Sequence, residues 1–278
     1  EAAAEKEEGL MEQYFEKGTL SEAELTKGLR IAIAHQQIFP VFCSSATRNM
    51  GSGRVMGFIN DICPAPNERP AAVLEDGSTL PCDSDADTTV FIFKTVSEPR
   101  VGTLSYFKVY AGTLHAGDEL VNAENREAER FGTIYVANGK EREAINHLVA
   151  GDIGVTVKLK KTHTNNTLNI KGVDRKIEPM HFPDPRIRVA VKPPSKSEME
   201  KLMKALHTIE EEDPTLIVEQ SKALKQTILH GQGQLHLDLT KHRIEMLHGV
   251  TMEFIEPRIP YRETITKVAN TEYRHKKQ

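Results

Sequence analysis

The period of the apolar residues changes along this chain, and the changes limit what it can fold into. Residues 1–38 are rich in helix-forming residues and repeat with a helical period. From residue 88 to residue 168 the period becomes two, and Ala-Gly and Gly-Asp turn signals separate short runs. From residue 186 to residue 255 the patterns follow the order β-α-β-β-α-β. We therefore predict a multidomain α+β protein with a β-barrel and a ferredoxin-like βαββαβ plait.

Local signals mark the ends of several predicted elements. Gly18 is expected to stop a first helix, and Ser21 with Glu24 has the spacing of a capping box that starts a second. The apolar run at residues 38–43 predicts a short strand. Residues 64–70 are punctuated by prolines, which indicates a linker and a first domain boundary.

Composition describes an ordinary globular protein. A chain of 278 residues is expected to form two or three domains, and its formal net charge of −4 does not by itself indicate nucleic-acid binding. The three cysteines are widely spaced, so the pattern suggests neither a disulfide framework nor a zinc site. No apolar run has the length of a membrane span and no export signal is present, so we expect a cytoplasmic protein without a membrane partner.

The stretch at residues 227–238 (TILHGQGQLHLD) carries a glycine pair that could be mistaken for a phosphate-binding loop. In the dinucleotide fingerprint the sixth position is a small residue, and here it is His236. The chain also contains no Walker sequence, whose lysine and hydroxyl neutralise phosphates and Mg²⁺. We therefore interpret Gly231 and Gly233 as a joint between a strand and a closely packed helix.

Other residue patterns suggest neither a metal site nor a catalytic residue. Histidines recur every six residues, which turns successive side chains away from one another on a helix: His230, His236, His242 and His248. Asp83, Asp85 and Asp87 lack the glycine and glutamate of a calcium loop. No serine stands in a nucleophile elbow, and no cysteine has an evident base. We expect no metal ligand and no catalytic residue.

Cations gather at the end of the last barrel strand. Lys158, Lys160 and Lys161 lead from this strand into a loop that also carries His163. Side chains of this kind can contact nucleic-acid phosphates, so we predict that these four residues bind RNA. The alternative is a solvated barrel face with no ligand.

Three further stretches, combined with residues 231–238, give the chain a resemblance to translation elongation factor G that runs nearly end to end. Residues 102–118 (GTLSYFKVYAGTLHAGD) are similar to the second domain that translational GTPases share. Residues 211–215 (EEDPT) and 260–264 (PYRET) resemble the third domain of that factor and its exit toward the fourth. Each motif is weak alone, and their combination is specific.

The resemblance implies a division of the chain into four parts. Residues 1–68 would be the C-terminal remnant of an α/β GTPase domain, and residues 69–178 the translation-factor β-barrel, or domain II. Residues 185–262 would be the ferredoxin-like domain III, and residues 263–278 the start of domain IV. The phosphate loop and both switch segments would lie upstream, so the chain is expected to be a non-catalytic fragment.

Ligands and partners follow from the same resemblance. Ser44, Ser45 and Ala46 would match the last guanine-recognition motif, as part of an incomplete site. GTP and Mg²⁺ would be cofactors of the full-length parent and not of this fragment, which is expected to be monomeric. The parent's partner would be the ribosome, through small-subunit rRNA and proteins, and its role would be translocation.

Two alternatives remain open from the sequence. A ribosomal protection protein or a release-type factor would share the barrel and the plait, although the helices at residues 1–38 favour elongation factor G. A stand-alone RNA-binding adaptor module is an alternative of another class. The chain also departs from the usual factor, with Gln234 where glutamate is common and Thr164-Asn165-Asn166 where a glycine is common. These departures suggest a divergent paralogue.

Overall fold

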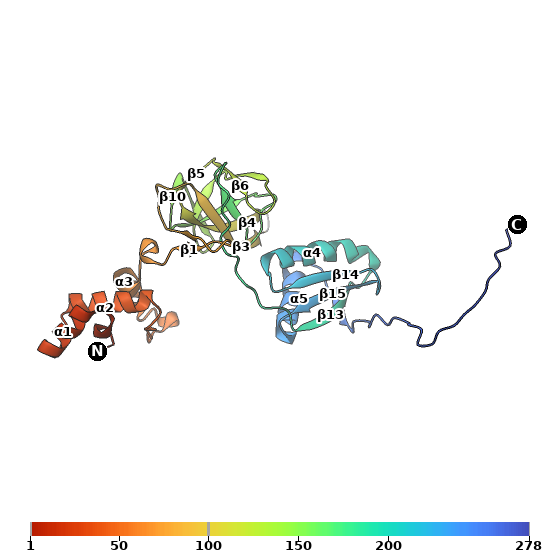
Figure 1. The fold of residues 1–278 in the computed structure, drawn as a ribbon, viewed down its shortest axis with the longest axis horizontal. Coiled ribbons are helices and arrows are strands. Elements are labelled where there is room, and N and C mark those ends of the chain that lie inside the picture. Colours follow the sequence, from red (N-terminus) through yellow and green to blue (C-terminus); the bar gives the residue numbers. More distant parts are fainter. Residues whose placement is uncertain (1, 99–100, 278) are drawn as a thin grey trace. The chain divides into compact units, whose positions relative to one another are not determined.

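The computed structural model describes residues 2–98 and 101–277, and the chain divides into two compact units, residues 1–180 and 181–278. Figure 1 shows the helices and strands of each unit. In the part of the chain that the structure describes, no helix is both long and apolar enough to cross a membrane.

The N-terminal part of the first unit is helical. Its helices are η1 (Ala4–Lys6), α1 (Glu8–Lys17), α2 (Glu22–Ala34), η2 (Ala46–Arg48), α3 (Ser52–Ile62) and η3 (Pro66–Glu68). Gly18 ends α1 in the left-handed conformation, with φ of 69°. Ser21 and Glu24 form a complete capping box at the start of α2. Both predicted helix signals are therefore confirmed.

The strand predicted at residues 38–43 is wrong. This segment is irregular, and Phe39 and Val41 are 77% and 92% exposed. A strand needs a neighbour for its main-chain hydrogen bonds, and the described residues of the helical part contain no strand that pairs with it. Phe42 instead contacts Phe58 of α3, with ring centroids 4.8 Å apart.

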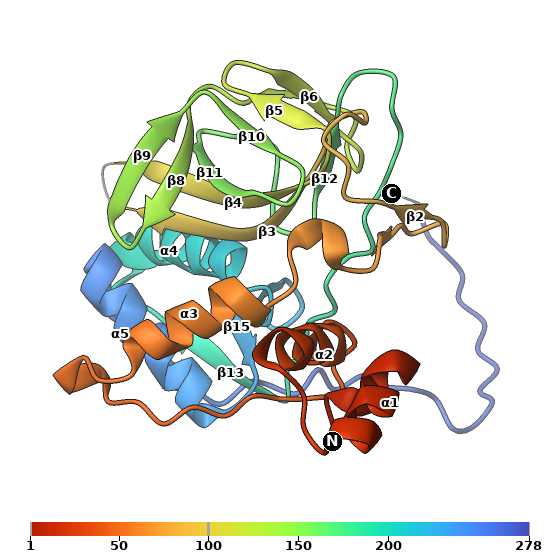
Figure 2. The same ribbon diagram turned by 90° about the vertical axis from the view of Figure 1, so that its left-hand side faces the viewer.

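The rest of the first unit is a β-barrel, whose curled strands are visible in Figure 2. Eight strands lie in the order β7-β6-β12-β3-β4-β11-β8-β9, and every pair is antiparallel. Two smaller pairs, β10-β5 and β1-β2, complete it. The strands are β1 (Ala72–Val73), β2 (Thr79–Leu80), β3 (Thr89–Glu98), β4 (Gly102–Ala111), β5 (Thr113–His115), β6 (Glu119–Asn122), β7 (Ala128–Arg130), β8 (Ile134–Asn138), β9 (Glu141–Ile145), β10 (His147–Val149), β11 (Ile153–Val157) and β12 (Thr167–Asn169).

Inward-facing aliphatic and aromatic side chains fill the barrel, as a period of two requires. Phe107 and Phe131 are fully buried and meet edge to face, with centroids 5.4 Å apart. Their companions in this core are Val90, Ile92, Val109, Leu114, Leu120, Ile134, Leu148, Leu159 and Leu168. The turn signals also act as predicted, because Gly112, Gly117 and Gly151 all have positive φ.

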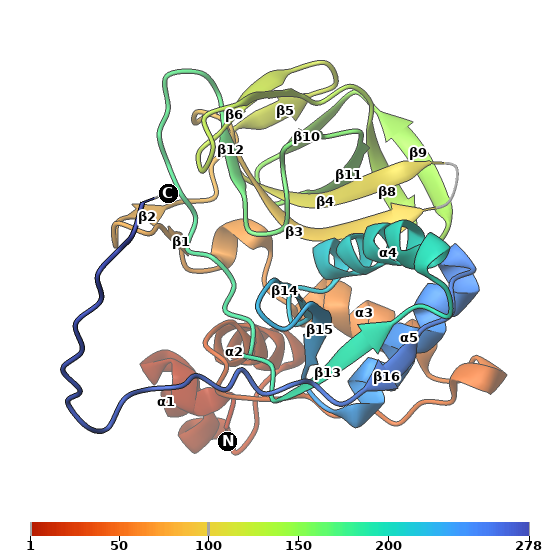
Figure 3. The same ribbon diagram turned by 90° about the vertical axis from the view of Figure 1, so that its right-hand side faces the viewer.

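The second unit is a plait with the predicted element order: β13 (Ile187–Lys192), η4 (Lys196–Glu198), α4 (Met199–Glu212), β14 (Ile217–Ser221), β15 (Gln226–Gly231), α5 (Gln234–His248) and β16 (Glu253–Ile255). Its antiparallel sheet has the order β14-β15-β13-β16 (Figure 3). Both helices contribute to a single core with the sheet, through buried side chains that include Leu206, Ile209, Leu229, Leu237 and Ile244. The fold class predicted from the sequence is confirmed.

The two glycines of the joint before α5 have different roles. Gly231 is buried, and a Cβ atom there would lie 2.6 Å from Leu237 Cδ2, so any larger residue would force the closely packed joint to shift. Gly233 is the N-cap of α5 in an extended conformation, and a Cβ atom there would meet no other atom within 4 Å. The main-chain N–H of Gln232 donates to His236 Nδ1 at 3.1 Å, so the Nε2–H of that ring donates to Asp213, 3.0 Å away.

The chain after β16 is extended. Residues 256–277 contain no helix or strand, and most of their side chains are exposed.

Candidate nucleic-acid interface

The residues predicted to recognise guanine, Ser44, Ser45 and Ala46, lie between α2 and α3. Ser45 and Met50 exchange two main-chain hydrogen bonds of 3.0 Å each, and this closes a tight loop before α3. A pocket of about 290 Å³ adjoins the loop, lined by Ser44, Ser45, Ala46, Met50, Ser52, Val55 and Met56. The main chain of Ser45 is paired with Met50, whereas the serine hydroxyls and the N–H groups of Ser44 and Ala46 form no hydrogen bond within the described residues and can face a ligand.

The predicted RNA-binding cations lie on a loop that follows β11, residues 158–166, which we call the barrel loop. It begins at Lys158, which has a left-handed φ of 68° and ends the strand. It turns again at Asn165, whose φ is 71°. Asparagine adopts this conformation more readily than most residues, so the turn can form here without a glycine. The Asn165 side chain is fixed by hydrogen bonds of 3.0 and 2.9 Å to the carbonyl and N–H of Met180.

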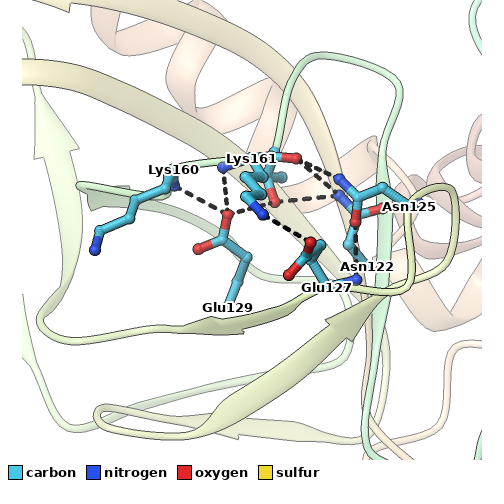
Figure 4. A network of polar contacts seen from close by, with 7 residues as sticks. Asn122, Asn125, Glu127, Glu129, Lys160 and Lys161 are labelled. Carbon is cyan, nitrogen blue, oxygen red and sulfur yellow. Dashed lines mark hydrogen bonds and ion pairs between the residues drawn. The ribbon is translucent and has the colours of Figure 1, made fainter.

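A buried carboxylate holds the middle of the barrel loop through its main chain (Figure 4). Glu129 on β7 is only 7% exposed. One of its oxygens accepts the N–H of Lys160 at 2.9 Å, the N–H of Lys161 at 2.6 Å and the Thr162 hydroxyl at 3.2 Å. These three donors satisfy the buried negative charge, which would otherwise be costly to place in the barrel wall.

Two asparagines, one at the end of β6 and one in the turn that follows it, add to this attachment. Asn125 donates to the Lys161 carbonyl at 2.7 Å. Asn122, which is fully buried, donates to the Thr162 hydroxyl at 3.2 Å and to Asn166 Oδ1 at 3.0 Å. Beside them, burial raises the pKa of the Glu124 carboxyl, although the N–H of Thr167 donates to it and opposes the shift. The loop is therefore fixed on the barrel independently of its lysine side chains.

The four predicted RNA-binding side chains are not equivalent. Lys158, Lys160 and His163 are exposed, and none of them takes part in an ion pair within residues 2–98 and 101–277. The Lys161 ammonium lies 2.7 Å from Glu127 Oε1, in a pair whose side chains are 59% and 49% exposed. Exposed pairs of this kind are weak. Lys161 can therefore reach a phosphate only by leaving Glu127, whereas the other three side chains need not move.

Sequence reasoning did not find Glu129, Asn122 or Asn125. A signal for Glu129 does exist, because it stands two residues before Phe131, and a period of two turns both side chains inward. A carboxylate at an inward position of a strand needs partners. No local signal names those partners, since they come from a loop more than thirty residues away.

The remaining acidic and histidine motifs of the sequence form no site. Asp83 Oδ1 accepts the N–H of Asp85 at 2.9 Å, as in an ordinary turn. Within the residues that the structure describes, no group of three acidic, histidine or cysteine side chains is placed to hold a metal ion.

Comparisons with known proteins agree with this architecture. Residues 87–170 match the family model described as elongation factor G domain 2, and residues 182–256 match the one described as Elongation Factor G, domain III. A crystal structure of a protein from Thermus thermophilus is similar to this chain, with a TM-score of 0.78 and 29% sequence identity. The similarity covers 96% of this chain and 38% of that one.

A translation-factor barrel followed by this plait defines the class of chain as translational GTPase-like. Both matched domains are those of one factor, and they occur in that factor's order along the sequence. The chain belongs to the elongation factor G family.

Proposed function

We propose that this chain supplies the ribosome-docking barrel and plait of a translocation GTPase. The observation that carries the proposal is the succession of two elongation factor G domains, residues 87–170 and 182–256, in a chain of which 96% aligns with one solved structure. The chain spans 38% of that relative's length. GTP and Mg²⁺ belong, in this proposal, to a nucleotide site completed by the rest of the protein, in the cytoplasm.

The residue assignments form part of the same proposal. Ser44, Ser45 and Ala46 contribute one edge of the guanine site, and the barrel loop contacts small-subunit rRNA. Exposed lysines on a loop with a fixed main chain suit phosphate contacts, because the loop loses little conformational freedom on binding. The domain divisions at residues 1–68, 69–178, 185–262 and 263–278 are proposed on the same basis.

Binding to purified small ribosomal subunits tests the docking role. Replacing Lys158 and Lys160 by glutamate should weaken binding by about tenfold or more, because each lost phosphate contact also removes counterion release. The matched control replaces Lys140 and Lys171 by glutamate, which changes the charge of the barrel equally at other exposed positions. Equal affinities for the two double variants would refute a specific role for the barrel loop.

Hydrolysis of GTP tests the catalytic part of the proposal. The isolated chain should show no GTP turnover above the uncatalysed rate, since the groups that position the phosphates and the attacking water are proposed to lie outside it. Turnover that rises in proportion to the concentration of this chain, after removal of contaminating GTPases, would contradict that assignment.

A further inference from the structure

One end of the plait contains a pocket that the proposed docking role does not use. We call it the plait pocket. It has a volume of about 470 Å³ and lies where β13 and β14 end, β15 begins and α4 starts. Its lining consists of Val191, Lys192, Met199, Met203, Gln220, Ser221, Lys222, Lys225, Gln226, Thr227, Ile255 and Arg258. The volume lies within the range of pockets that bind small ligands.

The charge of this lining is entirely positive. Lys192, Lys222, Lys225 and Arg258 contribute four cations, and no aspartate or glutamate is among the lining residues. None of the four forms an ion pair within the described part of the plait. The nearest acid by register is Glu253, which faces Lys192 across the β13–β16 ladder without pairing with it. Four unpaired cations around one hollow repel one another and favour an anionic occupant.

Part of this cationic surface is held in place by the main chain. The N–H of Arg258 donates to Gln226 Oε1 at 2.8 Å, and its guanidinium donates to the Leu224 carbonyl at 3.3 Å. The guanidinium is thereby attached to the turn between β14 and β15, which also carries the two lysines at positions 222 and 225. A planar guanidinium fixed in this way can present its remaining N–H groups to two oxygens of one anion.

The other side of the pocket is apolar. Val191, Met203 and Ile255 line it, and the Thr227 hydroxyl donates to Met203 Sδ at 3.6 Å. Met199 begins α4, a helix of 14 residues whose positive dipole end lies at this position. An anion with an attached organic group would satisfy both sides, whereas a small hydrated ion would leave the apolar side unused.

We propose that the plait pocket binds phosphate groups carried by a nucleotide-sized unit. A phosphodiester RNA strand and a free nucleoside polyphosphate present the same chemistry to the four cations. This inference goes beyond the docking proposal, because that proposal assigns phosphate contacts only to the barrel loop, and the pocket assignment holds whichever source supplies the phosphate.

Methyl signals of methionine test the site directly on the full chain. With ¹³C-methyl-labelled methionine, inorganic tripolyphosphate, GTP or an oligouridylate strand should shift the signals of Met199 and Met203. The buried Met252 and the exposed Met246 of the same unit should not move. A shift by the strand alone identifies RNA as the source, and a shift by GTP or tripolyphosphate alone identifies a free phosphate. No shift with any probe at millimolar concentration would overturn the proposal.

Charge variants test whether the pocket cations cause the binding. Replacing Lys222 and Lys225 by glutamate should weaken binding of the active probe by about tenfold. The control replaces Arg186 and Arg188, which are exposed at the other end of β13, by glutamate. The control should change affinity less than about twofold. Equal losses in the two variants would show attraction to overall charge and overturn the pocket assignment.

Small-subunit binding separates this inference from the docking proposal. If Met199 and Met203 respond to a probe while the chain fails to bind subunits, the pocket stands and the docking proposal fails. If subunits bind through the barrel loop while both methionine signals remain unchanged with every probe, the docking proposal stands and the pocket assignment fails.

Discussion

The barrel loop and the plait pocket are both cationic, yet the chain builds them in different ways. In the barrel loop a buried carboxylate, Glu129, holds the main chain, and the ammonium of Lys161 is already paired with Glu127. In the plait pocket four cations surround a hollow without ionic partners among the described residues. Two surfaces with similar numbers of cations can therefore differ in how they bind. The barrel loop offers a main chain of fixed shape, and the plait pocket offers positive charge that no acidic side chain of the described residues balances.

The largest effect should come from removing the carboxylate under the barrel loop. Glu129→Ala leaves the N–H groups of Lys160 and Lys161 without an acceptor, at a cost of about 2–4 kcal/mol in the free energy of unfolding. Urea denaturation followed by tyrosine fluorescence measures it, because the chain has no tryptophan and Tyr106, Tyr110 and Tyr135 lie in the barrel. Glu127→Ala is the control and should cost about 0–1 kcal/mol. Equal losses of unfolding free energy in the two variants would show that the main-chain hydrogen bonds to Glu129 stabilise the barrel no more than the exposed Lys161–Glu127 ion pair does.

The next effect belongs to the plait, where shape is fixed by packing. Gly231→Ala forces Cβ to within 2.6 Å of Leu237 Cδ2, so we expect a loss of about 1–3 kcal/mol from overpacking. Gly233→Ala meets no atom within 4 Å and should change stability by less than about 0.5 kcal/mol. Hydrogen exchange in α5 reports both. A larger loss of stability in Gly233→Ala than in Gly231→Ala would contradict the assignment of Gly231 as the closely packed glycine.

The Asp213–His236 contact makes part of the plait's stability depend on pH. Burial raises the pKa of Asp213, but hydrogen bonds from the hydroxyl and N–H of Thr215 and from His236 outweigh it, and the pKa is lowered overall. Because the folded pKa is depressed, the contribution is complete above the ordinary aspartate value of about 3.9 and disappears as the pH falls through the folded value.

Asp213→Asn tests that pH dependence. We expect the variant to be about 1 kcal/mol less stable at neutral pH, because the charged hydrogen bonds are weakened. It should also lose less stability than the parent as the pH falls below about 4. Chemical denaturation followed by helical circular dichroism at several pH values measures both. Parallel stability curves for the two proteins would exclude Asp213 as the group that titrates.

The smallest expected effect concerns Gln234, the first residue of α5. Its amide donates to Asp238 at 2.9 Å, one turn further along α5. Gln234→Glu replaces this bond by repulsion between two carboxylates, while the positive end of the helix favours the new charge. We expect a net change within about 0.5 kcal/mol, measured by thermal denaturation. A gain above about 1 kcal/mol would mean that glutamine at this position is selected for a reason other than stability.

Features encoded by neighbouring residues were predictable from the sequence, and those that depend on distant residues were not. Ser21 and Glu24 lie three residues apart, so their capping box can be read directly. The alternation in the barrel and the element order of the plait are repeated patterns, and they indicated the fold class. The run at residues 38–43 also has a strand composition, but a strand requires a partner, and the described residues contain none for it.

The candidate site was predictable only in its position. Lys158, Lys160 and Lys161 stand after a strand, and this places them on a loop. The pairing of Lys161 with Glu127 depends on residues 34 positions apart, and the support from Glu129 spans a similar separation. The plait pocket likewise combines residues from position 191 to position 258. No local sequence pattern connects the residues of either region, so these contacts can be found only in the folded structure.

The way in which Glu129 holds the barrel loop bears on how the loop can evolve. Its carboxylate binds main-chain N–H groups, which every amino acid except proline provides. The side chains at positions 160 and 161 are therefore free to change, while proline alone would break the attachment. Mutation can rewrite the charge of this surface, and with it the choice of partner, without disturbing the barrel beneath.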